Sequence, residues 1–379
     1  MGDKLMKINK QLAALLAATV VPLAASADDD RIAQAVTPLP EDLRAEATVY
    51  EYNDAGERVV LREGSNHVEC QPKDDMGFTM CFPKSTAARR DLSARLSADG
   101  LEGEELQAAL QKAEDAGEID PWPMGGMMYR HYDKDDRIQL LWVAVLPGAA
   151  SDELAMSTLS QRDASLAGQG LPWMMREGTD GAHLMIPINS TDLSNPGKAV
   201  MPRDTKAITD PIEQATLPLP EDLRPYAAVI DYDDEGNRVV LRPGRNAIEC
   251  QVRNETTGFT RCYHRSLGAE ADMQAKLMAE GKSMQEVGAA VAAARESGEL
   301  PTAPMGSMAY RLYEEDDRLR LLWVMRLPNA TAEELGMPTG SQRDSSLAGQ
   351  GLPWMMREGT ASAHLMIPIN GTELSNQKK

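Results

Sequence analysis

The sequence predicts an α+β protein of two tandem homologous domains, each a mainly antiparallel sheet with a two-helix insert and one intradomain disulfide. Nearly everything from Leu39 to Asn195 occurs a second time, at an offset of 180 and later 181 residues. A period this long indicates a duplicated domain, because solenoid repeats run about 20–50 residues. Within each copy, strand-like patterns precede and follow a helical stretch. Each copy also carries two cysteines.

The duplication sets the domain limits. Pro38–Arg44 returns at Pro218–Arg224, and Ser160–Thr179 returns at Ser341–Thr360 with one change. We place repeat 1 at residues 31–195 and repeat 2 at residues 211–376, and each is long enough to bury one core. Residues 196–210 carry proline and glycine without apolar periodicity, which is typical of a linker. A residue that an active site needs should appear in both repeats, if both are active.

Each element of repeat 1 follows from a local pattern. Asx and Gly residues between two β-rich runs predict a hairpin, and a second strand pair surrounds the cysteines. Leucines and alanines at helical spacing then predict two helices, the second of which stops at Gly117. The predicted strands are Ala47–Tyr52, Arg58–Arg62, His67–Cys70, Phe78–Phe82, Met127–Tyr132, Ile138–Leu146 and Ala182–Ile188, and the predicted helices are Ser85–Ala98 and Glu102–Ala116. Ile138–Leu146 becomes apolar on both faces, which indicates a central strand.

The cysteines predict two disulfides. Cys70 and Cys81 enclose ten residues, and Cys250 and Cys262 enclose eleven. Three pairings are formally possible. Pairing inside each repeat needs no contact between domains, and each short loop would contribute on the order of 3 kcal/mol. Zinc is the competing interpretation, but no second cysteine pair or nearby repeated histidine completes a four-ligand set.

The N-terminal residues 1–27 read as a signal peptide. Lys4, Lys7 and Lys10 precede an apolar stretch, and Ala25-Ser26-Ala27 provides a small-residue cleavage site. The apolar stretch is shorter than the roughly 20 residues that span a membrane. We therefore expect a periplasmic or secreted protein, oxidised at its cysteines, with no membrane insertion after signal cleavage.

Composition limits the partners. The formal net charge is −19, and loss of the signal peptide makes it more negative still. Such a surface repels nucleic acid and anionic lipid, so neither is expected as a partner. Gly168-Gln169-Gly170 is not followed by a helix start, so it does not predict a phosphate-binding loop, and no cofactor is expected. The expected partner is an unidentified protein or small molecule.

A series of short motifs runs through repeat 1, at Ala47–Val49, Leu61–Asn66, Cys70, Met80-Cys81, Asp163–Ser165, Trp173 and His183–Met185. These motifs match the signature Ala-Thr-Val, Leu-Arg-Glu-Gly-Ser/Thr-Asn, Cys, Met-Cys, Asp-Ala-Ser, Trp and His-x-Met. Through them, each repeat resembles an uncharacterised family of exported bacterial proteins. Repeat 2 departs from the signature at Arg242–Asn246, Arg261 and Asp344–Ser346. The resemblance implies export and the domain limits, and it implies no activity.

Two kinds of chemistry are possible at the repeated histidines, His183 and His364. Strand alternation puts each beside a methionine, Met185 or Met366, which would make a soft site suited to Cu(I). The alternative is a histidine satisfied by hydrogen bonds among core methionines. A hydrolase would need nearby carboxylates, and the candidates are Asp163 and Glu177 with His183, and Asp344 and Glu358 with His364. Capping and turn formation explain the same carboxylates without catalysis.

Trp173 and Trp354, each followed by two methionines, are candidates for contact with a ligand or partner. The competing interpretation is a loop folded back over its own core, since tryptophan is usually largely buried. Taken together, the sequence favours a non-catalytic binding or structural module of unknown ligand. A hydrolase and a Cu(I)-handling protein are the alternatives.

Overall fold

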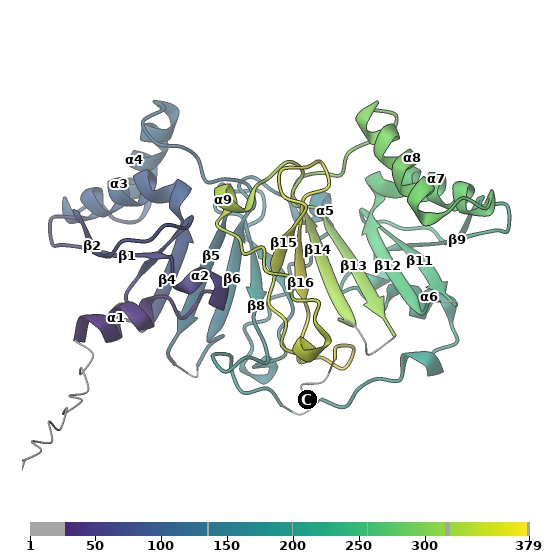
Figure 1. The fold of residues 1–379 in the computed structure, drawn as a ribbon, viewed down its shortest axis with the longest axis horizontal. Coiled ribbons are helices and arrows are strands. Elements are labelled where there is room, and N and C mark those ends of the chain that lie inside the picture. Colours follow the sequence, from purple (N-terminus) through teal and green to yellow (C-terminus); the bar gives the residue numbers. More distant parts are fainter. Residues whose placement is uncertain (1–26, 135, 199, 256, 315–318, 377–379) are drawn as a thin grey trace, which may run out of the picture.

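The computed structural model describes residues 27–134, 136–198, 200–255, 257–314 and 319–376. Apart from Ala27, the predicted signal peptide lies outside these residues. Each repeat forms an eight-stranded, mostly antiparallel sheet with helices, and each contains one disulfide (Figure 1). The predicted α+β tandem is therefore confirmed. In the described part of the chain, no helix is both long enough and apolar enough to cross a membrane.

Repeat 1 and the residue range that leads into it contain, in chain order, α1 (Ala27–Ala35), α2 (Glu41–Arg44), β1 (Thr48–Tyr52), β2 (Arg58–Arg62), β3 (Val68–Gln71), β4 (Phe78–Pro83), the 3₁₀ turn η1 (Lys84–Thr86), α3 (Ala87–Ala98), α4 (Gly103–Asp115), β5 (Met127–Tyr132), β6 (Leu140–Val145), α5 (Ser151–Leu154), η2 (Ala164–Leu166), β7 (Trp173–Met175) and β8 (His183–Pro187).

The remaining chain contains η3 (Thr205–Ala207), α6 (Pro211–Thr216), η4 (Arg224–Tyr226), β9 (Ala228–Tyr232), β10 (Arg238–Arg242), β11 (Ile248–Asn254), β12 (Phe259–His264), η5 (Arg265–Leu267), α7 (Gly268–Ala279), α8 (Met284–Glu296), β13 (Met308–Tyr313), β14 (Leu321–Arg326), α9 (Ala332–Leu335), η6 (Ser345–Leu347), β15 (Trp354–Met356) and β16 (His364–Pro368). The turn η3 falls within the predicted linker.

The strand order is the same in both sheets, β2-β1-β3-β4-β5-β6-β8-β7 and β10-β9-β11-β12-β13-β14-β16-β15. The pairs β1–β3 and β9–β11 are parallel, and the other neighbouring pairs are antiparallel. All six residues of β6 are buried, as expected for a central strand. The strand pair around the cysteines is also confirmed.

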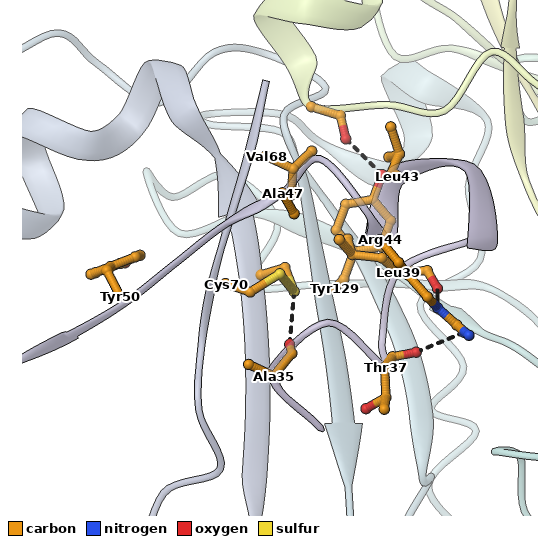
Figure 2. The surroundings of a disulfide bond; sticks show 12 residues. Ala35, Thr37, Leu39, Leu43, Arg44, Ala47, Tyr50, Val68, Cys70 and Tyr129 are labelled. Carbon is orange, nitrogen blue, oxygen red and sulfur yellow. Dashed lines mark hydrogen bonds between the residues drawn. A yellow bond between two sulfur atoms is a disulfide. The ribbon is translucent and has the colours of Figure 1, made fainter. Parts of the chain in front are cut away.

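The disulfides join directly paired positions on neighbouring strands. Cys70 on β3 lies opposite Cys81 on β4, and Cys250 on β11 lies opposite Cys262 on β12. Both pairings within a repeat are thus confirmed. The carbonyl oxygen of Ala35, at the end of α1, lies 3.4 Å from the Sγ of Cys81 (Figure 2). The bridge therefore sits under the N-terminal helix, in the buried core.

The expectation of a separate core for each repeat is corrected by the packing. The largest core cluster contains buried side chains of both repeats, including Trp142 and Leu184 from one and Trp323 and Leu365 from the other. Glycine makes one of the close approaches possible. A Cβ on Gly125 would lie 2.6 Å from Leu327 Cδ2 of the other repeat. The two sheets therefore share one continuous interior.

Two short segments cross between the repeats in a reciprocal way. We call residues 151–157, which include α5, and residues 332–338, which include α9, the exchanged turns. The Tyr129 hydroxyl donates to the Gly336 carbonyl at 2.6 Å (Figure 2). The Tyr310 hydroxyl donates in the same way to the Ala155 carbonyl at 2.5 Å. In Figure 1, α9 from the C-terminal repeat lies over the sheet of repeat 1, where it packs on β4. Each repeat thus supplies one turn of helix to the other.

The helical inserts, α3–α4 and α7–α8, stand at the two outer ends of the molecule (Figure 1). An ion pair joins the two helices of each insert. In repeat 1 it is Arg89 on α3 with Glu114 on α4, and in repeat 2 it is Glu270 on α7 with Arg295 on α8. The positions are equivalent and the charges are reversed. The contact between the helices was therefore kept while both of its residues changed.

Candidate functional site

Alternate residues of each strand point into the shared core or away from it, so each sheet has an inner and an outer face. The strand registers build the outer face of repeat 1 in rows. His183 lies opposite Val145 and Met175, and Met185 lies opposite Val143 and Trp173. Arg130 lies opposite Leu141 in the next row. The predicted placement of His183 and Met185 on one face follows this register.

A pocket of about 260 Å³ opens on the outer face of repeat 1. We call it the Arg162 pocket. Its apolar and aromatic walls come from Tyr132 on β5, Leu141 on β6 and Met185 on β8, with Phe78 and Ile138 beside them. Its charged groups are Arg130, Arg137, Arg162 and Asp136. Apolar walls with a few polar groups are typical of small-molecule sites.

The same pocket recurs in repeat 2, with a volume of about 250 Å³. We call it the Arg343 pocket. Its five lining residues are Tyr313, Leu319, Leu322, Arg343 and Met366. At the repeat offset of 181, each one corresponds to a lining residue of the Arg162 pocket. Four of the five pairs are identical, and the fifth exchanges isoleucine for leucine.

The arginine of each pocket is held by the same contact. Arg162 places its Nη2 3.4 Å from the sulfur of Met175 on β7, and Arg343 places its Nη2 3.4 Å from the sulfur of Met356 on β15. A thioether is a weak acceptor and carries no charge, so both guanidinium groups keep most of their donors for another partner. Both side chains are exposed, which leaves them accessible to a ligand.

Arg130 adds a second positive charge to the Arg162 pocket. Its guanidinium stacks over the Phe78 ring at 5.0 Å, and its buried Nε has no hydrogen-bond partner among the described residues. Burial lowers the pKa of Arg130, and the nearby charges of Arg162 and Arg137 lower it further. The carboxylate in the pocket, Asp136, lies 3.6 Å from Arg137. An anion would relieve the repulsion among these arginines.

The histidines lie in the outermost of these rows. The Nδ1 of His183 lies 2.6 Å from the Gly181 carbonyl, and the Nδ1 of His364 lies 2.7 Å from the Ser362 carbonyl. Because a carbonyl can only accept, Nδ1 carries the proton in both rings and Nε2 presents its lone pair. Burial lowers the pKa of both histidines, that of His364 to about 4. Both rings are neutral at pH 7.

The candidate hydrolase carboxylates have other bonding partners. Asp163 and Asp344 each accept a hydrogen bond at 2.8 Å from the backbone of the second residue after them, Ser165 and Ser346. Glu177 accepts from the Ser151 backbone at 3.0 Å, and Glu358 accepts from the Ala332 backbone at 2.8 Å. Glu177 and Glu358 thereby cap the exchanged turns. Among the described residues, no hydrogen bond joins these carboxylates to His183 or His364.

These bonds also fix the charge of the carboxylates. The hydrogen bonds from Ser151 lower the pKa of Glu177, and those from Ser165 lower the pKa of Asp163. Hydrogen bonding to the ionised form has this effect on a carboxylate. Asp163 and Glu177 are thus held as anions in local caps, an arrangement that the capping interpretation explains in full.

Trp173 and Trp354 are each 1 % exposed. Trp173 packs with Leu141, Val143 and Met185, and Trp354 packs with their counterparts in repeat 2. The ligand-contact role predicted for the two indoles therefore has no exposed surface to act through. The alternative, a segment folded over its own core, matches this burial.

The proposed copper ligands differ in how far they are exposed to solvent. Met185 and Met366 are 2 % exposed or less, while His183 is half-buried. The charges that most affect the pKa of His183 are those of Arg176, Arg130 and Arg162. Surrounding cations oppose the binding of a metal cation. No group of three or more His, Cys, Asp or Glu side chains in the described residues is arranged to hold a metal ion.

The sequence analysis did not identify Arg130 and Arg162 as site residues, nor their counterparts in repeat 2, Arg311 and Arg343. A signal for them was available, because Tyr-Arg-x-Tyr stands at Tyr129–Tyr132 and again at Tyr310–Tyr313. An arginine kept in both repeats, on a strand whose other residues are mostly apolar or aromatic, is unusual for a core strand.

Comparison of the chain with protein-family models, with curated proteins and with solved structures finds no match.

Proposed function

We propose that this chain is an exported, non-catalytic binding protein, periplasmic or secreted, that takes up a small organic anion in each of two equivalent pockets. The anionic group would bind Arg162 or Arg343, and an apolar body would lie against the tyrosine and leucine walls. The resemblance to exported proteins, the predicted signal peptide and the two disulfides support the location.

The observation that carries the proposal is the repetition of the pocket. Pockets of about 260 and 250 Å³ are lined by equivalent residues. Other parts of the outer faces diverged freely. Val145 corresponds to Arg326, Met80 to Arg261 and Met128 to Ala309. Retention of a pocket amid such change supports a role for both pockets.

Charge supports an anionic ligand. The chain as a whole carries a net charge of −19, so its average surface repels anions. The Arg162 pocket has three arginines and one carboxylate, and Arg130 is without an ion-pair partner in the described residues. Guanidinium groups offer paired donors that fit a carboxylate.

The test uses octanoate, which combines a carboxylate with an apolar chain, and octanol as its uncharged match. Isothermal titration of the oxidised mature protein should show two octanoate sites and no comparable octanol binding. Replacing Arg162 and Arg343 together by Gln should weaken octanoate binding roughly tenfold or more, because a charge-assisted hydrogen bond contributes about 1.5–3 kcal/mol. The Arg95→Gln variant removes the same charge from an exposed position on α3 and should bind as wild type.

Two results would overturn the proposal. One is equal binding of octanoate and octanol, which would make the charge irrelevant. The other is octanoate binding that survives the double replacement or is absent from the wild type. The single variants separate the pockets, since each should remove one site and leave the other.

A further inference from the structure

A third pocket lies in repeat 1, at the row of His183 and beneath the helical insert. Its volume is about 760 Å³, within the range of drug-sized ligand sites. We call it the Trp122 pocket. Met128, Val145 and Pro147 provide an apolar floor, and the polar side chains come from α3, α4, the loop that follows β7 and the start of β8. It lies at the opposite end of the outer face from Arg130 and Leu141, which belong to the Arg162 pocket.

The charges of this pocket balance. Arg89 is ion-paired with Glu114, and the remaining pair of opposite charges is Arg176 and Asp180. His183 is neutral, because burial and then the nearby arginines lower its pKa, and its Nδ1–H donates to the Gly181 carbonyl. The Arg162 pocket, by contrast, has an excess of positive charge. A balanced set of polar groups favours an uncharged ligand with many hydroxyl groups.

Trp122 gives the pocket an aromatic surface. Of the five tryptophans, Trp142, Trp173, Trp323 and Trp354 are 2 % exposed or less, whereas Trp122 is partly exposed. It stands between Pro121 and Pro123, which limit the backbone around it. An indole presents a wide apolar face at a low cost in conformational entropy. A sugar ring has C–H groups on one face to stack there and hydroxyls at its rim for hydrogen bonding.

Side-chain amides complete the polar rim. Gln107 and Gln111 both line the pocket from α4. An amide donates and accepts at once, and so do the vicinal hydroxyls of a sugar. The ion-paired Arg89 and Glu114 offer the same combination of donor and acceptor on the adjoining surface.

Repeat 2 provides an internal comparison. There the positions of Trp122, Gln111 and Asp180 hold Ala303, Ala292 and Ala361, and the corresponding pocket has about 370 Å³. The histidine and Arg357 remain, but the aromatic surface and the amides are gone. We propose that the Trp122 pocket of repeat 1 binds a neutral saccharide, and that repeat 2 has no equivalent site.

The experiment uses the exposure of Trp122. Iodide quenching of intrinsic fluorescence selects this residue in the full mature protein, because the other four indoles are buried. Maltotriose, cellotriose and triacetylchitotriose are added in turn, with trigalacturonate as the charged comparison. At least one neutral trisaccharide should protect Trp122 from iodide and release heat on titration. The Gln111→Ala variant should weaken that binding roughly tenfold, because a direct hydrogen bond to the ligand is lost.

Matched variants keep the test decisive. Lys112→Ala alters the neighbouring exposed residue of α4 and should bind as wild type. Trp122→Ala should abolish the heat of binding. If the tryptophan variant does not fold, Gln111→Ala tests the same pocket. The proposal is overturned if none of the three neutral trisaccharides binds, if trigalacturonate alone binds, or if Gln111→Ala binds as tightly as wild type. Octanoate binding at the other two pockets is independent of each of these outcomes.

Discussion

The two repeated histidines differ in their burial and in one charged neighbour. His364 lies directly opposite Arg326 on β14, whereas His183 lies opposite Val145 on β6. The pKa of His364 is lowered to about 4, first by burial and then by nearby positive charges, of which that of Arg326 is the largest. The pKa of His183 is also lowered, by burial first, without an arginine in that position. The same strand thus carries a histidine of different acidity in each repeat.

This difference predicts a pH dependence of stability. The unfolded chain protonates His364 near pH 6.5, well above the folded state, so the unfolded state binds more protons as the pH falls. The stabilisation is present above about pH 6.5 and is lost towards pH 4. Between pH 7.5 and 5.5 the free energy of unfolding should fall by roughly 1 kcal/mol through this residue.

Urea unfolding of wild type and variants over that pH interval measures the effect. His364→Gln should flatten the dependence, and His183→Gln should flatten it less. Each replacement should also cost on the order of 1 kcal/mol at neutral pH through one lost hydrogen bond. An unchanged pH slope in His364→Gln would contradict the assignment.

At the scale of elements, the ion pair of the helical insert can be tested by exchanging the charges of its two residues. Arg89 and Glu114 are 12 % and 24 % exposed, so their side chains are largely shielded from water. Arg89→Glu should place two carboxylates together and destabilise the protein by roughly 1–3 kcal/mol. Adding Glu114→Arg restores the arrangement that repeat 2 uses and should recover most of the loss.

A double-mutant cycle by chemical denaturation checks this prediction. Arg95→Glu on the exposed side of α3 is the matched control and should change stability little. If the double variant is no more stable than Arg89→Glu alone, the pair does not hold the two helices together.

Some elements were predictable from local pattern and others were not. Alternation and turn residues located seven strands to within about two residues, as with Ile138–Leu146 for β6. The strand β7 was missed because its three residues, Trp173–Met175, are all large and apolar and show no alternation. The parallel pairing of β1 with β3 was also missed, because periodicity identifies a strand and not its neighbour.

The same limit applies to the candidate pockets. Alternation places Met185 and His183 on one face, but only the strand order brings Arg130 of β5 and Arg162 of a distant loop to Met185 of β8. Duplication identified the repeated histidines and carboxylates as candidates. Their bonding partners, which make the carboxylates caps, depend on contacts that a single sequence does not reveal.

At the scale of the whole molecule, the shared interior determines how the protein should respond to cutting. Proteolysis within residues 196–210 removes the covalent link but none of the core contacts between the repeats. We expect the two fragments to remain associated and to migrate as one species under native conditions. Size-exclusion chromatography of the cleaved, oxidised protein measures this.

Separately expressed repeats give the complementary result. Each half alone exposes the surface that the other repeat covers, including the contact that its tyrosine, Tyr129 or Tyr310, makes with an exchanged turn. Each half should therefore be unfolded or self-associated, and mixing the halves should restore a stable pair. Two monomeric halves that each unfold cooperatively at the stability of the whole protein would refute the shared core. The shared core escaped prediction because the helices of the exchanged turns are only four residues long.

The exchanged turns have one more consequence. The covalent link keeps the two repeats at an effective concentration in the millimolar range. The two repeats can therefore stay associated even when their contacts are not identical. His67 donates to the Met337 carbonyl at 3.1 Å, while its counterpart in repeat 2 is Ala247. Ser157 donates to Asp222 at 2.8 Å, while the counterpart of Ser157 is Pro338. In a homodimer, each such substitution would occur at both copies of the contact. In the fused chain it occurs at one, so the contact made by one exchanged turn can change while the contact made by the other is kept.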